Sequence, residues 1–81
     1  MTKPARHEIR VGFVVASILE MRRRGATHYR VGVYRLFRDG NVWTKSSRFD
    51  SSDIPALRFA LDEAQAWILD KQQEIKTGGE V

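Results

Sequence analysis

The sequence predicts an α+β domain in which an antiparallel three- to four-stranded β-sheet is followed by one C-terminal amphipathic helix. Apolar and β-branched residues accumulate between residues 8 and 49 without helical spacing, which is typical of strands. The dipeptide Asp39-Gly40 within this stretch indicates a tight hairpin turn. From Ser51 onward the apolar residues change to a helical spacing. The 81 residues are expected to form one domain with a thin core.

Residues 8–22 predict the first strand. Their apolar side chains occupy both parities, which is typical of a central strand or of one that is covered on both faces. A strand of this length is well beyond the usual length of about 5–6 residues, so we expect a bend or bulge at Gly12. The polar residues 1–7, which include Pro4, are expected to form a flexible arm.

Residues 27–38 and 41–49 predict the second and third strands. The hairpin between them is expected to be a type I turn followed by Gly40 in the left-handed conformation of a bulge. A shift of one residue would move every side chain of the third strand to the other face. In the expected register one face carries Tyr29, Val31, Val33, Phe37, Trp43 and Phe49, and the other carries Arg30, Tyr34, Leu36, Thr44, Ser46 and Arg48.

The last segment predicts an amphipathic helix. Ser52 or Asp53 can cap its N-terminus, where Asp53 also complements the helix dipole, and Pro55 is compatible with the first turn. Gly78-Gly79 is expected to end the helix, so that residues 8–77 form the domain and residues 78–81 a flexible tail. An apolar stripe runs along Ile54, Leu57, Leu61, Ala64, Ile68 and Ile75, and its first five members are expected to be buried against Val31, Val33 and the first strand.

Composition argues against several classes of protein. The chain has no cysteine, which excludes a disulfide framework and a thiolate zinc site and is typical of a cytoplasmic protein. No apolar run approaches the roughly 20 residues of a membrane span, and residues 11–19 lack the cleavage site of a signal peptide. His7 and His28 have no partner at ligand spacing, and no serine lies in a triad context. We therefore expect no metal, no cofactor and no enzymatic activity.

Charge is divided by position along the chain. Residues 1–49 hold eleven of the fourteen Lys and Arg against three acidic residues, a net charge of +8. Residues 50–81 hold three basic against seven acidic residues, a net charge of −4. The predicted sheet is therefore basic and the predicted helix acidic. A basic sheet is typical of a protein that binds a polyanion, although a charged surface that only keeps a small domain in solution has the same composition.

Basic and aromatic residues interleave on the predicted hairpin. Single-stranded nucleic acid is held by a positive surface that follows the phosphates and by aromatic rings on which bases stack. An ordinary exposed strand face also pairs Arg with Tyr, and a basic turn at residues 22–24 can be only a charged turn. The candidate nucleic-acid-binding residues are Arg10, Arg22, Arg23, Arg24, Arg30, Tyr34, Arg38, Lys45 and Arg48.

Residues 29–68 resemble the Whirly and transcriptional-coactivator group of single-strand DNA binders. The resemblance rests on the hydrophobic strand 31–37, on Arg38-Asp39-Gly40, on Trp43 and on the basic segment before the helix. Where that group has Lys-Gly before its final strand, this chain has Ser47-Arg48-Phe49. The resemblance implies single-strand DNA binding.

Two further resemblances were found. The chain is similar to a set of short uncharacterised bacterial proteins, which implies no activity. The residues shared with that set are Ile9-Arg10-x-Gly12, Tyr29-x-Val31, Asp39-Gly40, Trp43, Ser47-x-Phe49 and Ala64-x-x-Trp67-Ile68. The order of three strands and a helix also resembles plant ethylene-response-factor and integrase arm domains, whose sheet enters the major groove of duplex DNA.

Together these features predict a homodimer that binds single-stranded nucleic acid through a basic, aromatic face of its sheet. The dimer is expected because one helix cannot cover both apolar parities of the first strand, and because Phe59 and Trp67 add apolar surface beside the stripe. Two alternatives fit the same sequence. The basic face could meet an acidic protein in an interaction or assembly module, or a three-stranded sheet could bind duplex DNA.

Overall fold

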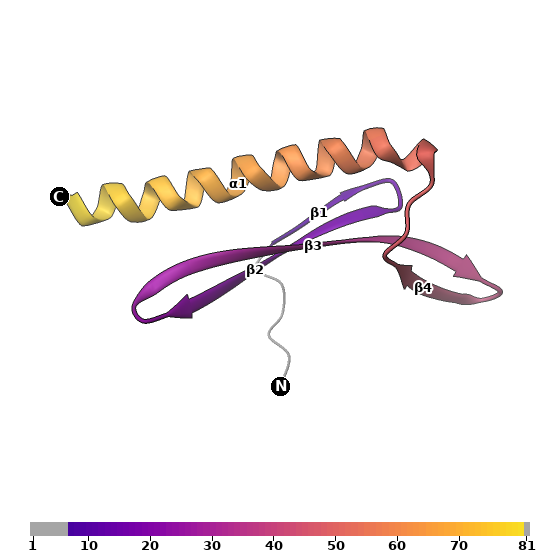
Figure 1. Ribbon diagram of the computed structural model, residues 1–81, viewed down its shortest axis with the longest axis horizontal. Coiled ribbons are helices and arrows are strands. Elements are labelled where there is room, and N and C mark those ends of the chain that lie inside the picture. The colour runs from indigo at the N-terminus through magenta and orange to yellow at the C-terminus, as the bar shows by residue number, and fades with distance from the viewer. Residues whose placement is uncertain (1–6, 81) are drawn as a thin grey trace.

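The computed structural model describes the backbone of residues 7–80 and the side chains of residues 7–73. It confirms an α+β fold with a four-stranded antiparallel sheet followed by one helix (Figure 1). The strands are β1 (His7–Val11), β2 (Val14–Arg23), β3 (Ala26–Asp39) and β4 (Val42–Ser46). A 3₁₀ turn (Ser51–Asp53) leads into α1 (Ile54–Glu80).

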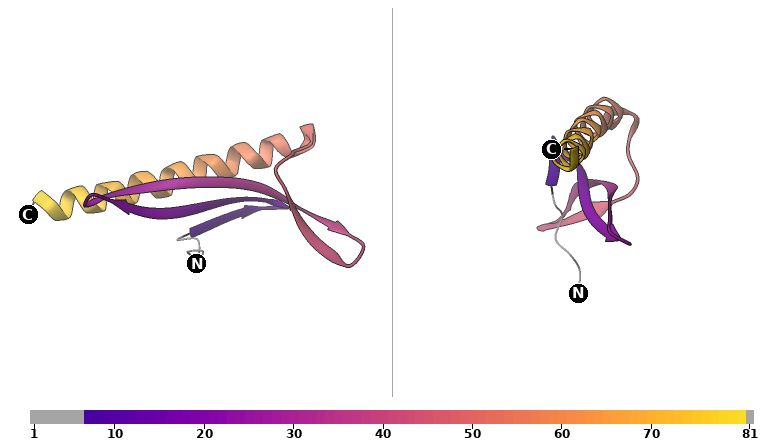
Figure 2. Two further views of the ribbon diagram at one scale, coloured as in Figure 1. Left: turned by 60° about the horizontal axis from the view of Figure 1, so that its bottom comes forward. Right: turned by 90° about the vertical axis from the view of Figure 1, so that its left-hand side faces the viewer.

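The strands lie in the order β1-β2-β3-β4, and α1 crosses one face of the sheet over β1 and β2 (Figures 1 and 2). The molecule is a thin slab with extents of 53 × 31 × 15 Å. Two layers therefore make up the fold, and the second face of the sheet carries no helix. No helix in the described part of the chain is both long and apolar enough to cross a membrane.

The segment predicted as one long strand is a hairpin. β1 and β2 pair antiparallel around the loop Gly12-Phe13, where Gly12 has φ +62°. Glycine takes this left-handed conformation without steric cost and is typical of the first position of a two-residue hairpin loop. Because a two-residue loop switches the parity of inward-facing residues, Val11 and its partner Val14 share a face. This switch explains why β1 and β2 direct opposite parities toward the same face, while Val15, Leu19 and Met21 place further apolar side chains of β2 on the other face.

The β3–β4 register also differs from the predicted one. The loop has two residues, Gly40-Asn41, so Arg38 pairs with Trp43 and Asp39 with Val42. Gly40, with φ +64°, is the first loop residue and not a bulge after a type I turn. The difference from the predicted register is an odd number of residues, which moves Trp43 to the face of Arg38 and Tyr34.

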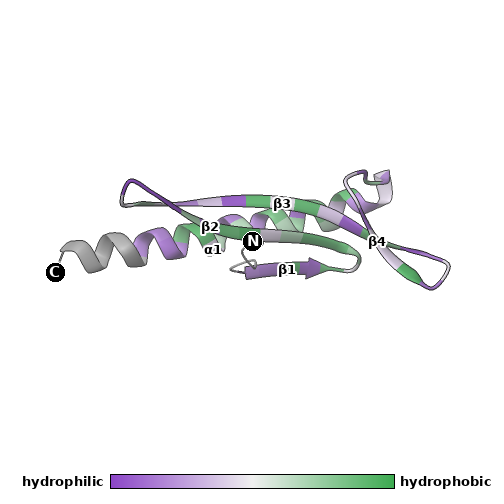
Figure 3. Cartoon of the chain, turned by 90° about the horizontal axis from the view of Figure 1, so that it is seen from below, coloured by the Kyte–Doolittle hydropathy of each residue, from purple (hydrophilic) through white to green (hydrophobic). Residues whose placement is uncertain are grey.

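The core lies between the middle of β2 and the N-terminal half of α1. Its buried hydrophobic cluster consists of Val14, Ala16, Ile18, Ala60 and Ala64. The two alanines let α1 approach the sheet closely, and Figure 3 shows the hydrophobic middle of β2 beside its hydrophilic hairpin with β3. The helical stripe is thus only partly core, because Ala64 is buried while Ile54 and Leu61, contrary to the expectation, remain 43% and 42% exposed.

His7 belongs to the sheet and not to the predicted arm. Its ring stacks on Trp67 of α1 with 5.0 Å between ring centroids and an interplanar angle of 4°. The edge of the same indole meets Tyr29 of β3 at 5.7 Å and 90°. The resulting cluster ties the first and third strands to the middle of α1, so Trp67 is a packing residue.

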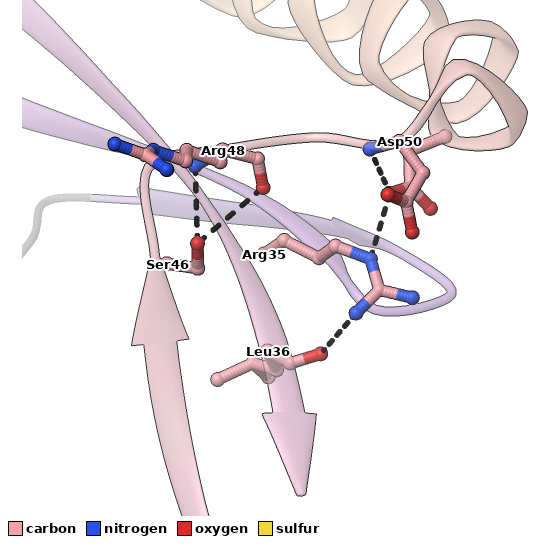
Figure 4. Close-up of polar contacts among 6 residues, drawn as sticks. Arg35, Leu36, Ser46, Arg48 and Asp50 are labelled. Carbon is pink, nitrogen blue, oxygen red and sulfur yellow. Dashed lines mark hydrogen bonds and ion pairs between the residues drawn. The ribbon is translucent and has the colours of Figure 1, made fainter.

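Polar contacts fix the start of the helical segment against β3 (Figure 4). The Nε of Arg35 donates to Oδ2 of Asp53 at 2.7 Å, and the backbone N–H of Asp50 donates to the same oxygen at 2.9 Å. Asp50, not Ser52 or Asp53, is the N-cap residue, and Asp53 closes the turn from the third position. The carboxylate of Asp53 therefore serves both the helix start and its attachment to the sheet.

At the other end, α1 continues through Gly78-Gly79 to Glu80, beyond the predicted end at residue 77. A glycine in a helix costs only about 1 kcal/mol relative to Ala, so a glycine pair does not by itself terminate a long helix.

Candidate nucleic-acid interface

The face of the sheet opposite α1, here called the open face, is defined by strand parity. Side chains alternate between the two faces of a strand, and paired residues of antiparallel strands share a face. The register therefore assigns to the open face Glu8, Arg10, Val15, Ser17, Leu19, Met21, Arg23, His28, Arg30, Tyr34, Leu36, Arg38, Trp43 and Lys45. Glu8 is the only carboxylate among these described side chains.

Six predicted binding residues come from the four strands and lie on this face. They are Arg10 of β1, Arg23 of β2, Arg30, Tyr34 and Arg38 of β3, and Lys45 of β4. Arg10, Arg30, Arg38 and Lys45 are exposed. The sheet thus places on one face positive charge that is dispersed along the sequence.

Two of these arginines are held by backbone carbonyls. The Nε of Arg10 donates to the Gly12 carbonyl at 3.2 Å. The Nε of Arg38 donates to the Gly40 carbonyl at 3.0 Å, and its Nη2 donates to Oδ1 of Asn41 at 3.4 Å. None of these acceptors is a carboxylate, so these contacts pair neither guanidinium with an acidic side chain. The hairpin loops therefore orient charges at one end of the open face.

Tyr34 is already engaged within the protein. Its hydroxyl donates to Oε2 of Glu8 at 3.4 Å, and Nζ of Lys45 lies 4.5 Å from the centre of its ring. This cation–π contact occupies one face of the ring. Burial raises the pKa of the Tyr34 phenol above its ordinary value, the charge and hydrogen bond of Glu8 raise it further, and Arg10 opposes them. Tyr34 is thus a poorer base-stacking residue than the sequence predicted.

The raised pKa of Tyr34 predicts a loss of stability in alkali. The folded state keeps a phenol proton that the unfolded chain releases near its ordinary pKa of 10.0, so the contribution is complete below that pH. It is lost as the pH rises from there through the folded pKa. Urea unfolding at about pH 9 and about pH 11 should show a larger decrease for the wild type than for Tyr34→Phe. Equal decreases in the two proteins would show that titration of Tyr34 does not cause the loss of stability in alkali.

An exposed aromatic pair lies beside the basic residues at the β3–β4 end. Phe13 and Trp43 stack with 5.7 Å between ring centroids and an interplanar angle of 26°. Phe13 is 49% exposed and Trp43 is 52% exposed. The backbone N–H of Leu36 donates to the Phe13 carbonyl at 2.8 Å and fixes the first loop against β3. The two stacked rings therefore form an aromatic surface that is open to solvent.

Sequence reasoning did not select Phe13 and Trp43. Phe13 was assigned to the interior of a strand, and Trp43 was placed on the opposite face by the wrong register. A two-residue loop at Gly40-Asn41 would have placed Trp43 beside Arg38. The sequence of the hairpin loop therefore contained the information that places Trp43, but a different turn type was predicted and put Trp43 on the wrong face.

The remaining predicted binding residues do not lie on the open face. Arg22 points to the other face by parity, and Arg24 lies in the β2–β3 loop with φ 52°. Arg48 lies in the loop after β4, where its backbone N–H donates to Oγ of Ser46 at 3.1 Å. The expectation that Arg48 lies on a strand beside Arg30 is wrong, because β4 ends at Ser46.

Across the described residues, no group of three or more His, Asp or Glu side chains is placed to hold a metal ion. Comparisons with protein-family models, with curated proteins and with solved structures find no match. The candidate interface therefore rests on the geometry and charge of the open face itself.

Proposed function

We propose that the protein binds single-stranded nucleic acid through the open face of its sheet. The observation that carries this proposal is the exposed Phe13–Trp43 stack next to the basic residues of β3 and β4. Bases stack on exposed aromatic rings whatever their sequence, while nearby Lys and Arg hold the phosphates. A surface that provides both is suited to a flexible, unpaired strand.

The aromatic platform favours a single strand over a duplex. In a duplex the faces of the bases are buried in the stack, so an aromatic ring reaches them only if the duplex is opened or kinked, which costs a few kcal/mol per base step. Unpaired bases offer their faces without that cost. The positions of Phe13 and Trp43 would have no role in a sheet that only reads base edges in a groove.

Charge supports the same partner. Arg10, Arg30, Arg38 and Lys45 face outward on one surface, and the described side chain of Arg30 makes no hydrogen bond or ion pair within the protein. An acidic protein could also pair with these cations. It would not require the exposed aromatic stack beside them, so we favour nucleic acid.

The salt dependence of binding tests the role of the arginines. Affinity for a single-stranded oligonucleotide should fall with salt by a log–log slope of about −0.7 for each phosphate contacted, because bound counterions are released. The double variant Arg30→Ala/Arg38→Ala should reduce the magnitude of that slope by about 1.4 units, since it removes two phosphate contacts. Fluorescence anisotropy of a labelled oligonucleotide at several salt concentrations measures the slope.

Arg58→Ala is the matched control, because Arg58 is an exposed arginine on α1, in the other layer of the fold. It should leave the slope close to that of the wild type. The same assay with an unlabelled duplex competitor separates the two kinds of nucleic acid. Failure of any oligonucleotide to bind near about 50 mM salt, where electrostatic binding is strong, would exclude the proposal.

A further inference from the structure

A cavity with basic lining residues opens at the loop of the β2–β3 hairpin. It is lined by Arg23, Arg24, Ala26 and His28, and its volume is about 500 Å³. Three of these residues lie on the open face, because Arg23 pairs with Ala26 and His28 pairs with Met21. Figure 1 shows the β2–β3 and β3–β4 hairpins at opposite ends of the sheet. The cavity is therefore separate from the Phe13–Trp43 stack.

The cations of this cavity have no partner within the described part of the chain. The side chains of Arg23, Arg24 and His28 make no hydrogen bond or ion pair there, and no carboxylate lines the cavity. Glu8 of the open face lies beside Ser17, whereas Arg23 is six residues further along β2. At about 3.3 Å per residue that separation is roughly 20 Å, well beyond the Debye length of about 8 Å at physiological salt. The charge of the two guanidinium groups is thus available to an external anion.

The backbone of the loop provides a second observation. Arg24 and Gly25 form a two-residue loop in which φ is 52° and 78°. Positive φ at both positions is typical of a type I′ turn, whose first position favours Asn, Asp or Gly. An arginine is strained in this left-handed conformation, and the side chain of Arg24 makes no polar contact within the described residues that would offset the strain. A bound anion would account for an arginine at this position.

The donors of the cavity match a phosphate monoester better than an internal phosphodiester. A guanidinium donates two parallel hydrogen bonds to the oxygens of one phosphate. A phosphate monoester carries a charge of about −1.5 to −2 at neutral pH and offers three strong acceptor oxygens. A phosphodiester within a strand carries a single charge and only a pair of free oxygens, so one arginine satisfies it. Two guanidinium groups and an imidazole around one cavity therefore provide more donors than a phosphodiester uses.

We propose that this cavity binds the terminal phosphate monoester of the single strand that lies on the open face. The presence of the strand rests on the proposed function, whereas the phosphate chemistry rests on the cavity itself. His28, Arg30 and Arg38 share the open face of β3, so basic side chains continue from the cavity toward the Phe13–Trp43 stack. The anchored end thus fixes the direction in which the strand crosses the sheet.

End-phosphorylated oligonucleotides test the site. A strand long enough to cross the sheet should bind about 10-fold more tightly with a phosphate at its 5′ or 3′ end than with hydroxyl groups at both ends, because charge-assisted hydrogen bonds are added. The end that gives the preference identifies the direction of the strand. Arg24→Asn should remove the preference without unfolding the hairpin, since Asn-Gly is favoured in a type I′ turn. Urea unfolding should show that Arg24→Asn is at least as stable as the wild type.

Arg22→Asn is the matched control. It removes the same charge from the same hairpin, but Arg22 points to the other face of β2, so the preference for a phosphorylated end should persist. The ratio of the two affinities separates a specific site from general electrostatic attraction, which both variants weaken. Equal affinities of phosphorylated and unphosphorylated strands, or an equal loss of the preference in the two variants, would overturn the terminal-phosphate site.

Inorganic phosphate tests the cavity without nucleic acid. Millimolar phosphate should shift the backbone amide NMR signal of Gly25 in the wild type but not in Arg24→Asn, relative to chloride at the same ionic strength. If this shift occurs and no oligonucleotide binds, the proposed function fails, but the cavity remains a phosphate site whose ligand is a small phosphate ester. Absence of the shift in the wild type would reject the cavity as a phosphate site.

Discussion

Replacing Ile18 with Ala is expected to destabilise the fold by about 2–5 kcal/mol, the usual cost of truncating a buried aliphatic side chain. Ile18 is 0% exposed and is one of the two largest fully buried side chains among the described residues. It lies in the middle of β2, paired with His7 on one side and Val31 on the other, beneath the alanines of α1.

This loss is large for such a chain, because a domain of 81 residues has a total stability of only about 4–12 kcal/mol. Leu19→Ala is the matched control. Leu19 is the next residue of the same strand, but it points to the open face and is half-buried, so its truncation should cost less. Urea unfolding at one fixed protein concentration measures both losses. Equal costs at the two positions would mean that the core is not centred beneath α1.

The elements with strong local signals could be predicted from sequence. The helix followed from the spacing of its apolar residues, and β3 was predicted to within one residue at each end because turn residues flank it. The split of residues 8–22 into two strands was missed. Gly12-Phe13 has one glycine and no Asn or Asp, so its local signal for a loop is weak, and only the pairing of Val11 with Val14 reveals the hairpin.

The site was harder to predict because it depends on register and on packing between layers. Charge alone was enough to select Arg30, Arg38 and Lys45, which do share a face. Trp43 required the correct turn type, since any odd change in register moves it to the other side. The orientation of α1 on the sheet could not be predicted from the sequence either. Part of its stripe packs on the sheet and part is exposed, and the periodicity alone does not say which part does which.

Trp43→Ala is expected to weaken binding of a single-stranded oligonucleotide by about 5- to 150-fold, which corresponds to the roughly 1–3 kcal/mol that stacking of one base contributes. The indole is 52% exposed and is held in place by its stack on Phe13. Because stacking releases no counterions, the salt slope should stay unchanged, in contrast to the arginine variants. Val42→Ala is the control, since Val42 is adjacent and 65% exposed but points to the other face of β4.

The fluorescence of the two tryptophans gives an independent readout of the same contact. A base stacked on Trp43 should quench its emission, so titration with oligonucleotide should quench the wild type and Trp67→Phe but not Trp43→Phe. Trp67 is packed between His7 and Tyr29 in the helix–sheet contact and lies away from the open face. Quenching that persists in Trp43→Phe, together with an unchanged affinity of Trp43→Ala, would show that bases do not stack at this position. The basic residues would then bind a partner through charge alone, which is the behaviour expected for an acidic protein.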